Sequence, residues 1–255
     1  MSTPGTILVT GGTGRLGSPL VERLRQQGET VRVLSRRAAT GADGPERVVG
    51  DLAWNQGLQE ALAGIATVFH CATAQRGEIK MASNLISAAR AAGVTHLIYI
   101  SIVGVDKIPL GYYRTKLNVE KLLVDSGLGV TIQRSTQFHQ LLQQGFHALR
   151  LLPVMPVPAR MDMQPIDAAD VADRLIELSR SGPAGRASDI GGPQVAPIAE
   201  FARSYLTATR RHRPIVPLLI PGRIAAAYRR GDHLAPASRA GQATFVEYIS
   251  QWAGR

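Results

Sequence analysis

Residues 6–17 read Thr6-Ile7-Leu8-Val9-Thr10-Gly11-Gly12-Thr13-Gly14-Arg15-Leu16-Gly17, an apolar run that leads directly into glycines. A pyrophosphate can approach a backbone closely only where side chains are missing, and the positive end of a helix dipole stabilises it. Gly11 would allow a tight turn, Gly14 would let phosphates approach, and Gly17 would let a following helix pack on the strand. The candidate cofactor-binding residues of this loop are Gly11, Gly12, Thr13, Gly14, Arg15, Leu16 and Gly17.

The residues around these glycines decide how much weight the motif carries. Three glycines alone are weak evidence, because glycines also occur in ordinary turns. Here apolar residues recur at helical spacing from Leu16 to Leu24, Gly28 can end that helix, and residues 30–34 form a second apolar run. This strand, helix and strand fit the roughly thirty residues of a dinucleotide-binding unit.

Length and composition favour one large α/β domain. The chain has 255 residues, which is enough to bury a substantial core. Its apolar run at 215–220 is bracketed by prolines and is far shorter than a membrane span, and the N-terminus lacks the pattern of a secretory signal. The single cysteine, Cys71, excludes an internal disulfide and fits a reducing compartment. We therefore predict a cytoplasmic protein with no membrane partner.

The net charge of +10 raises the question of a nucleic-acid or membrane partner. The basic residues are mostly arginines spread along the chain without aromatic residues between them, with clusters at 210–213 and 229–230. A solvated, arginine-rich surface explains this pattern more simply than nucleic-acid binding does. We expect no nucleic-acid role, although the clusters could attract anionic ligands.

Strand and helix patterns alternate through the first half of the chain. This alternation predicts an open, doubly wound parallel sheet of the Rossmann type with helices on both faces. We expect a cofactor-binding core over residues 1–134, and over 135–255 the remaining core elements with a small C-terminal substrate lobe, all in one structural domain. The strands are expected near residues 6–10, 30–34, 46–51, 66–70, 96–101 and 130–134, with helices from Leu16 and near 58–63, 79–92 and 113–125.

The pattern loosens after residue 135. Prolines at 153, 156, 158 and 165 interrupt the chain, so we expect residues 135–165 to be an irregular insertion that forms a pocket. A helix is expected over 167–180 and a short strand near 189–190. Further helices are expected over 196–209, 222–230 and 243–253.

The residues that follow the second strand of a dinucleotide site select between the two nicotinamide cofactors. An acidic residue there binds a ribose 2′-hydroxyl, whereas arginine suits a 2′-phosphate. This chain has Ser35-Arg36-Arg37, with Arg15 in the glycine loop, so NADP(H) is preferred over NAD(H). The alternative is that both arginines belong to a solvated loop. Asp51 ends the third strand and could contact the adenine, or it could cap the segment that follows, and the adjacent Leu52 is a further candidate cofactor-binding residue.

A second group of residues could carry chemistry. Tyr112 and Lys116 are four residues apart at the start of the helix predicted near 113–125, and Ser101 ends the strand before it. Residues at this spacing share a helix face, so an ammonium can favour the ionised form of a phenol, and such a phenol can protonate a carbonyl oxygen while hydride reaches the carbon. A tyrosine–lysine pair alone is more often a coincidence on the surface.

In this order, the motifs resemble those of the short-chain dehydrogenases/reductases. Residues 99–106, 112–116, 131–138 and 166–172 look most like the atypical, NmrA-like NAD(P)H-binding branch. The resemblance implies that Tyr112 donates a proton, that Lys116 holds the nicotinamide ribose and that Ser101 orients the substrate oxygen. It also implies that further residues line the cofactor, namely Cys71, Ala72, Thr73, Ser135, Thr136, Gln137 and Phe138.

The resemblance implies an NADPH-dependent reductase of a small carbonyl or quinone-like compound, acting as a monomer or homodimer. One departure leaves an alternative open: Glu78 stands where relatives with a full catalytic set carry asparagine. Many NmrA-like proteins do no known chemistry, so the alternative is a regulatory protein that senses NADP(H) and engages a protein partner. His70 is expected to be a packed or capping residue, His139 could contact substrate, and the histidines show no metal-ligand spacing.

Overall fold

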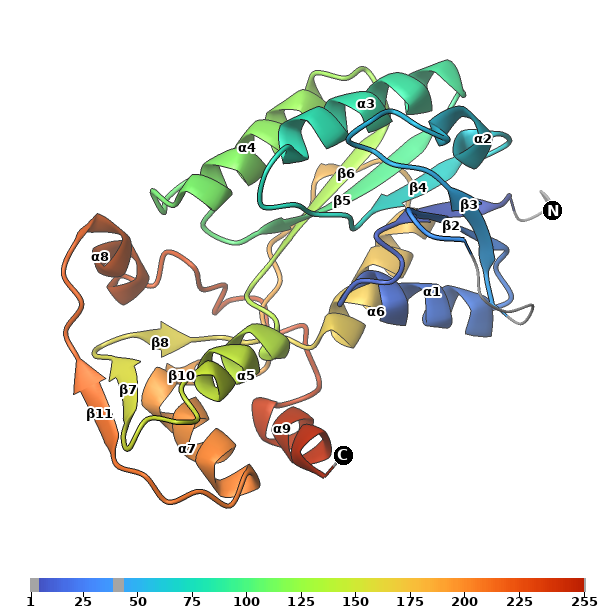
Figure 1. Ribbon diagram of the computed structural model, residues 1–255. Helices are drawn as coiled ribbons and strands as arrows, with labels where there is room; N and C mark the ends of the chain where they lie inside the picture. The colour runs from blue at the N-terminus through green and yellow to red at the C-terminus, as the bar shows by residue number, and fades with distance from the viewer. Residues whose placement is uncertain (1–4, 39–43, 255) are drawn as a thin grey trace. The chain divides into compact units, whose positions relative to one another are not determined.

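The computed structural model describes residues 5–38 and 44–254 (Figure 1). Its elements form two compact units, each discontinuous in sequence. Unit 1 comprises Met1–Ser101, Arg114–Gln133 and Val171–Ser188, and unit 2 comprises Ile102–Tyr113, Arg134–Asp170 and Asp189–Arg255. The chain therefore passes from one unit to the other several times.

Unit 1 is built on a parallel sheet. Among the described residues this sheet has seven strands in the order β3-β2-β1-β4-β5-β6-β9. Ile7 of β1 pairs with Val31 of β2 on one side and with Thr67 of β4 on the other, so the strand order reverses at β1. Open sheets bind ligands at such a reversal. The strands are β1 (Ile7–Thr10), β2 (Val31–Ser35), β3 (Glu46–Val49), β4 (Thr67–His70), β5 (His96–Ile102), β6 (Val130–Ser135) and β9 (Gly185–Arg186).

Helices cover both faces of the sheet. Figure 1 shows α2, α3 and α4 on one face and α1 and α6 on the other. Strands enclosed on both faces need nearly continuous apolar sequence, and Leu8, Val68 and Leu97 are buried in one core with Leu85 of α3. The Rossmann-type fold is thus confirmed. The helices are α1 (Gly17–Gln26), α2 (Leu58–Leu62), α3 (Glu78–Ala91), α4 (Gly111–Val124) and α6 (Ala168–Arg180).

Unit 2 has its own core. Aromatic side chains dominate it, with Phe146, Phe201 and Phe245 packed edge to face or tilted against their neighbours. Two small sheets flank it: β7 pairs with β11 in parallel and β8 with β10 antiparallel. The elements are α5 (His139–Ala148), β7 (Met155–Pro158), β8 (Asp162–Met163), β10 (Ala196–Pro197), α7 (Ile198–Ala208), β11 (Ile215–Leu218), α8 (Arg223–Arg229) and α9 (Phe245–Ala253).

Three expectations from the sequence are wrong in detail. Residues 135–165 are not an irregular insertion, because they contain α5 and β7. The last strand of the main sheet is β9, whereas Ile190 forms only an isolated bridge to Ser135. The third strand ends at Val49, and Asp51 bridges to Gln56 instead. Within the part of the chain that the structure describes, no helix is long and apolar enough to span a membrane.

Candidate cofactor and catalytic site

The glycine loop has the shape that the sequence predicts. Gly11 has a φ of +68°, and a Cβ there would lie 2.7 Å from the backbone nitrogen of Ala72. A Cβ on Gly17 would overlap the carbonyl oxygen of Gly11, so side chains are excluded at both positions. The amide of Gly14 donates to the same carbonyl at 2.8 Å, which closes the turn. The first and last glycines therefore let β1, the end of β4 and α1 meet at van der Waals distance.

The start of α1 suits an anion. Leu16 at the N-cap offers no side-chain hydrogen bond, and the first turn contains no acidic residue. Thr13, Gly14 and Arg15 are exposed beside it. A helix N-terminus without a side-chain cap leaves backbone donors and a partial positive charge for a ligand. The loop thus fits the pyrophosphate of a dinucleotide.

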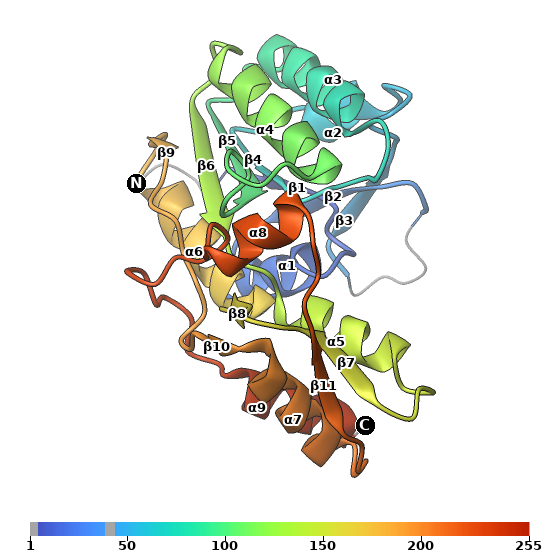
Figure 2. The same ribbon diagram turned by 90° about the vertical axis from the view of Figure 1, so that its left-hand side faces the viewer.

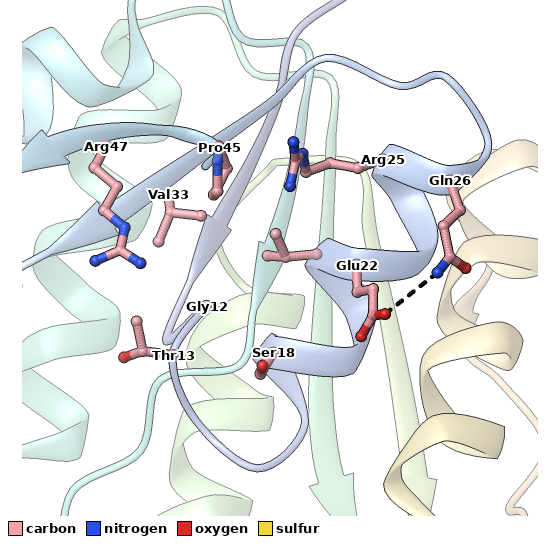
Figure 3. Close-up of a pocket in the computed structure, with 10 residues that line it drawn as sticks. Gly12, Thr13, Ser18, Glu22, Arg25, Gln26, Val33, Pro45 and Arg47 are labelled. Atoms are coloured by element: carbon pink, nitrogen blue, oxygen red, sulfur yellow. Dashed lines mark hydrogen bonds between the residues drawn. The ribbon is translucent and has the colours of Figure 1, made fainter. Parts of the chain in front are cut away.

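A hollow of about 600 Å³ opens beside this loop (Figure 3). Gly12, Thr13 and Val33 line it together with two arginines, Arg25 and Arg47. Sequence reasoning missed both arginines. The signal that could have found Arg47 is the strand register, which sets it directly opposite Val33 of β2.

The arginines that the sequence did select follow β2. Arg36 and Arg37 are both exposed, and the backbone amide of Arg37 donates to the Ser35 hydroxyl at 3.2 Å. Two residues beyond the third strand, the Asp51 carboxylate accepts from the amide of Ala53 at 2.7 Å, which is the capping role left open above. Leu52 is buried.

A buried ion pair lies within unit 1. The Lys116 ammonium and the Glu78 carboxylate are 2.9 Å apart, and their side chains are 5% and 0% exposed. Glu78 also accepts hydrogen bonds from the hydroxyls of Thr73, at 3.0 Å, and Tyr99, at 3.3 Å. Lys116 in turn donates to the carbonyl of Ile100 at 3.3 Å and lies over the Tyr99 ring. A buried charge needs such a full set of partners.

This network explains the unusual residue at position 78. Glu78 begins α3, and its carboxylate joins Thr73, after β4, to Lys116 of α4. Ala72, the residue before Thr73, lies against Gly11. An unbroken series of contacts therefore runs within unit 1 from the glycine loop to Lys116. The carboxylate therefore fixes the lysine for which the family resemblance implies a contact with the nicotinamide ribose.

His70 extends the same cluster. Its Nδ1 lies 2.8 Å from the Thr10 hydroxyl, and its ring stacks on Tyr99. Burial, and secondarily the positive charge of Lys116, lower the pKa of His70 to about 3. The imidazole is therefore neutral at physiological pH, and His70 is a packed residue as expected.

Two further side chains lie at the ends of β4 and β5. The Ser101 hydroxyl is buried and has no hydrogen-bond partner among the residues that the structure describes. A buried hydroxyl without a partner can donate a hydrogen bond to an oxygen of a bound ligand. Burial raises the pKa of the Cys71 thiol to about 12, so this cysteine is not a thiolate nucleophile.

The tyrosines of α4 differ from one another. Tyr112 is 37% exposed, whereas Tyr113 is buried in unit 2. The Tyr113 hydroxyl lies 3.1 Å from that of Tyr228 and accepts from the Gln137 amide at 3.2 Å. Burial, reinforced by Tyr228, raises the pKa of Tyr113 above its usual range. Tyr113 is therefore a structural phenol, and Tyr112 is the accessible one.

The segment after β6 is buried in unit 2. Ser135, Thr136 and Gln137 are each less than a tenth exposed, and Phe138 is the N-cap of α5. His139 is fully buried, with its Nε2 3.0 Å from the carbonyl of Ala243. Across the described residues, no group of three or more His, Cys, Asp or Glu side chains could hold a metal ion.

Comparison with known proteins identifies relatives of this chain. A family model described as NAD(P)H-binding matches residues 11–181. The chain is 30% identical to the NAD(P)H azoreductase of Xenophilus azovorans over 80% of its own length and 74% of that protein. It is 32% identical to quinone oxidoreductase 2 of Escherichia coli over 51% of its own length and 48% of that protein.

Solved structures share the fold. The NADPH-dependent quinone oxidoreductase of Escherichia coli, in complex with NADPH, superposes with a TM-score of 0.84 at 21% identity. The match covers 96% of this chain and 99% of that one. At this identity the likeness establishes the architecture, in agreement with the parallel sheet described above.

Proposed function

Because the chain belongs to the NAD(P)H-binding family and is an NAD(P)-dependent oxidoreductase, we propose that it uses NADPH to reduce a small carbonyl or quinone-like compound. The observation that carries this proposal is the contact path from the glycine loop to the buried Lys116, which donates to the carbonyl of Ile100, the residue before Ser101 with its unsatisfied hydroxyl. The path supports a cofactor on the loop and a polar substrate atom near Ser101. Two relatives are named as an azoreductase and a quinone oxidoreductase, which supports a reductase, whereas two others are named photosystem II assembly factors, which supports the alternative of a regulatory protein.

Each residue has a defined role in this proposal. The glycine loop and the start of α1 bind the pyrophosphate, and Lys116 donates a hydrogen bond to the nicotinamide ribose. Ser101 donates a hydrogen bond to the substrate oxygen. When bound, the nicotinamide supplies a hydride to the substrate carbon. Tyr112 gives its hydroxyl proton to the oxygen, and solvent restores that proton afterwards.

The role of Tyr112 predicts different results for two substrate classes. In Tyr112→Phe, we expect kcat/KM for an aliphatic aldehyde to fall about 100-fold, because the proton donor is lost. A quinone should lose less, since its reduced oxygens can take protons from water. The measurement is NADPH oxidation with a carbonyl, a quinone and an azo dye. Tyr113→Phe is the control and should leave the ratio between the classes unchanged; an unchanged carbonyl rate in Tyr112→Phe would remove Tyr112 from the mechanism.

The cofactor preference predicts a second result. We propose that Arg36 and Arg37 bind the 2′-phosphate of NADPH, since charge-assisted hydrogen bonds favour that group. Replacing both with glutamine should raise KM for NADPH at least tenfold and leave KM for NADH nearly unchanged. Arg90→Gln, on the exposed face of α3, is the control. If Arg47→Gln alone causes that loss, the 2′-phosphate binds in the hollow beside the loop instead.

A further inference from the structure

Unit 2 carries an apolar segment that its own core does not cover. Residues 217–224 are all exposed, and they include Leu218, Leu219, Ile220 and Ile224, with Leu219 66% exposed. Figure 2 shows this segment leaving β11 and running to α8. Single exposed leucines are ordinary, but four large aliphatic side chains within seven residues form a patch that calls for a partner.

The charges around this segment are mostly positive. Residues 201–231 contain seven arginines and no aspartate or glutamate, and Arg230 pairs with Asp232 at 2.6 Å. Arg223 lies inside the exposed segment, and the Arg229 guanidinium donates to the carbonyl of Ile220 at 2.7 Å. On the far side of β11, Arg211 and Arg213 donate to carbonyls of the 149–152 segment, where Leu151 is also exposed. The exposed aliphatic side chains are therefore bordered by Arg223 and Arg229 at the α8 end of the segment, and Arg211 lies beyond the start of β11.

Contrary to the expectation of no membrane partner from the sequence, we propose that the 217–224 segment docks unit 2 onto an anionic lipid bilayer. Leu219 and Ile220 enter the boundary between headgroups and acyl chains, and the neighbouring arginines bind lipid phosphates. This combination of apolar burial and attraction to anionic lipid is how peripheral proteins bind membranes without spanning them. The run at 215–220, too short to cross a bilayer, is long enough to insert at its surface.

Other occupants fit less well. Single-stranded nucleic acid is bound through aromatic stacking, and residues 206–227 contain no aromatic side chain other than His212. A second copy of the chain, related by a two-fold axis, would bring Arg223 and Arg229 of each copy face to face. Protein interfaces are enriched in aromatic residues, which this segment also lacks. Anionic lipid offers acyl chains that bury the aliphatic side chains and phosphates that pair with the arginines.

Vesicle flotation of the whole protein tests the proposal. The protein is expected to float with vesicles of mixed phosphatidylcholine and phosphatidylglycerol, to stay in solution with pure phosphatidylcholine, and to dissociate partly as salt increases. Leu219→Ser with Ile220→Ser should weaken binding at least tenfold. Val124→Ser with Val246→Ser removes two equally exposed aliphatic side chains elsewhere and should not weaken it. The thermal midpoint and NADPH oxidation with a water-soluble quinone check that both double variants are folded.

Three outcomes would overturn the proposal. The first is no flotation with the anionic vesicles. The second is flotation that the Leu219→Ser, Ile220→Ser variant retains in full, which would mean that the arginines act alone. The third is a dimer, seen by sedimentation velocity, that this variant dissociates, which would make the segment a contact between copies. Because reductase activity is measured separately on a soluble substrate, failure of membrane binding and failure of the proposed reaction are distinguishable.

Discussion

Replacing Lys116 by methionine is expected to lower the free energy of unfolding by about 3–5 kcal/mol, because it leaves the Glu78 carboxylate buried without its cation. The two charged groups are 2.9 Å apart and almost completely excluded from solvent. Removing one partner of such a pair costs far more than the pair contributes. Hydrogen bonds from Thr73 and Tyr99 offset part of the loss but supply no opposite charge.

The double variant distinguishes the ion pair from packing. Glu78→Gln alone should also destabilise the protein, since it leaves the ammonium unpaired. Glu78→Gln combined with Lys116→Met removes both charges and should regain about 2 kcal/mol or more relative to additive losses. The measurement is urea unfolding followed by far-UV circular dichroism. Arg174→Met is the matched control, because Arg174 pairs with Glu177 on the exposed face of α6 and should cost at most about 1 kcal/mol.

The same variants separate stability from function. If Lys116 binds the nicotinamide ribose, the double variant should be more stable than the sum of the two single losses implies and still show KM for NADPH raised at least tenfold. If Lys116 has only a structural role, the double variant should regain cofactor binding together with stability. If the double variant loses as much stability as the two single variants together, that result would contradict the ion pair itself.

The nucleotide-binding half could be predicted from the sequence because its signals are local. β1, its turn and α1 are encoded by adjacent residues, and strands buried on both faces read as unbroken apolar runs. The elements of the second half have weaker signals in the sequence. β7 and β11 contain prolines, which normally argue against a strand, yet each lies at an edge of its two-stranded sheet, where a missing amide donor is tolerated. In α5 the apolar spacing is broken by buried His139 and Gln143, so the helix did not stand out.

In the candidate site, too, contacts between residues distant in sequence could not be predicted. Glu78 could be located by counting along the chain, but its partner is 38 residues further on, and only the packing of α3 and α4 on one sheet face brings them together. Tyr99 read as an ordinary core residue of β5, yet it contacts His70, Glu78 and Lys116. Contacts of this kind depend on strand order, which periodicity does not encode.

The buried histidine of this cluster should make the protein sensitive to acid. The pKa of His70 is lowered from 6.5 to about 3, chiefly by burial and secondarily by Lys116. In the folded state the imidazole stays neutral, whereas in the unfolded chain it takes up a proton below pH 6.5. The unfolded state therefore binds more protons in this range, so the contribution of His70 is fully present above pH 6.5 and is lost as the pH falls towards 3.

The size of this effect follows from the shift. At 1.36 kcal/mol per pKa unit, the loss between pH 6.5 and roughly pH 4 is about 3 kcal/mol. Burial also lowers the pKa of His96, His139 and His233, so the whole protein should lose more than His70 alone accounts for. The test therefore compares the free energy of unfolding of a variant with that of the parent at each pH.

His70→Phe keeps an aromatic ring against Tyr99 and removes the titrating group. The variant should be less stable than the parent at pH 7, because the Thr10 hydroxyl loses its partner, but the gap between them should shrink by about 3 kcal/mol by roughly pH 4. Urea unfolding at a series of pH values measures it. Phe69→Leu, at the neighbouring buried position, binds no proton and should give a curve parallel to that of the parent. A gap between His70→Phe and the parent that stays constant over this range would mean that the folded protein does not hold His70 neutral, and that the charge of Lys116 is screened from it.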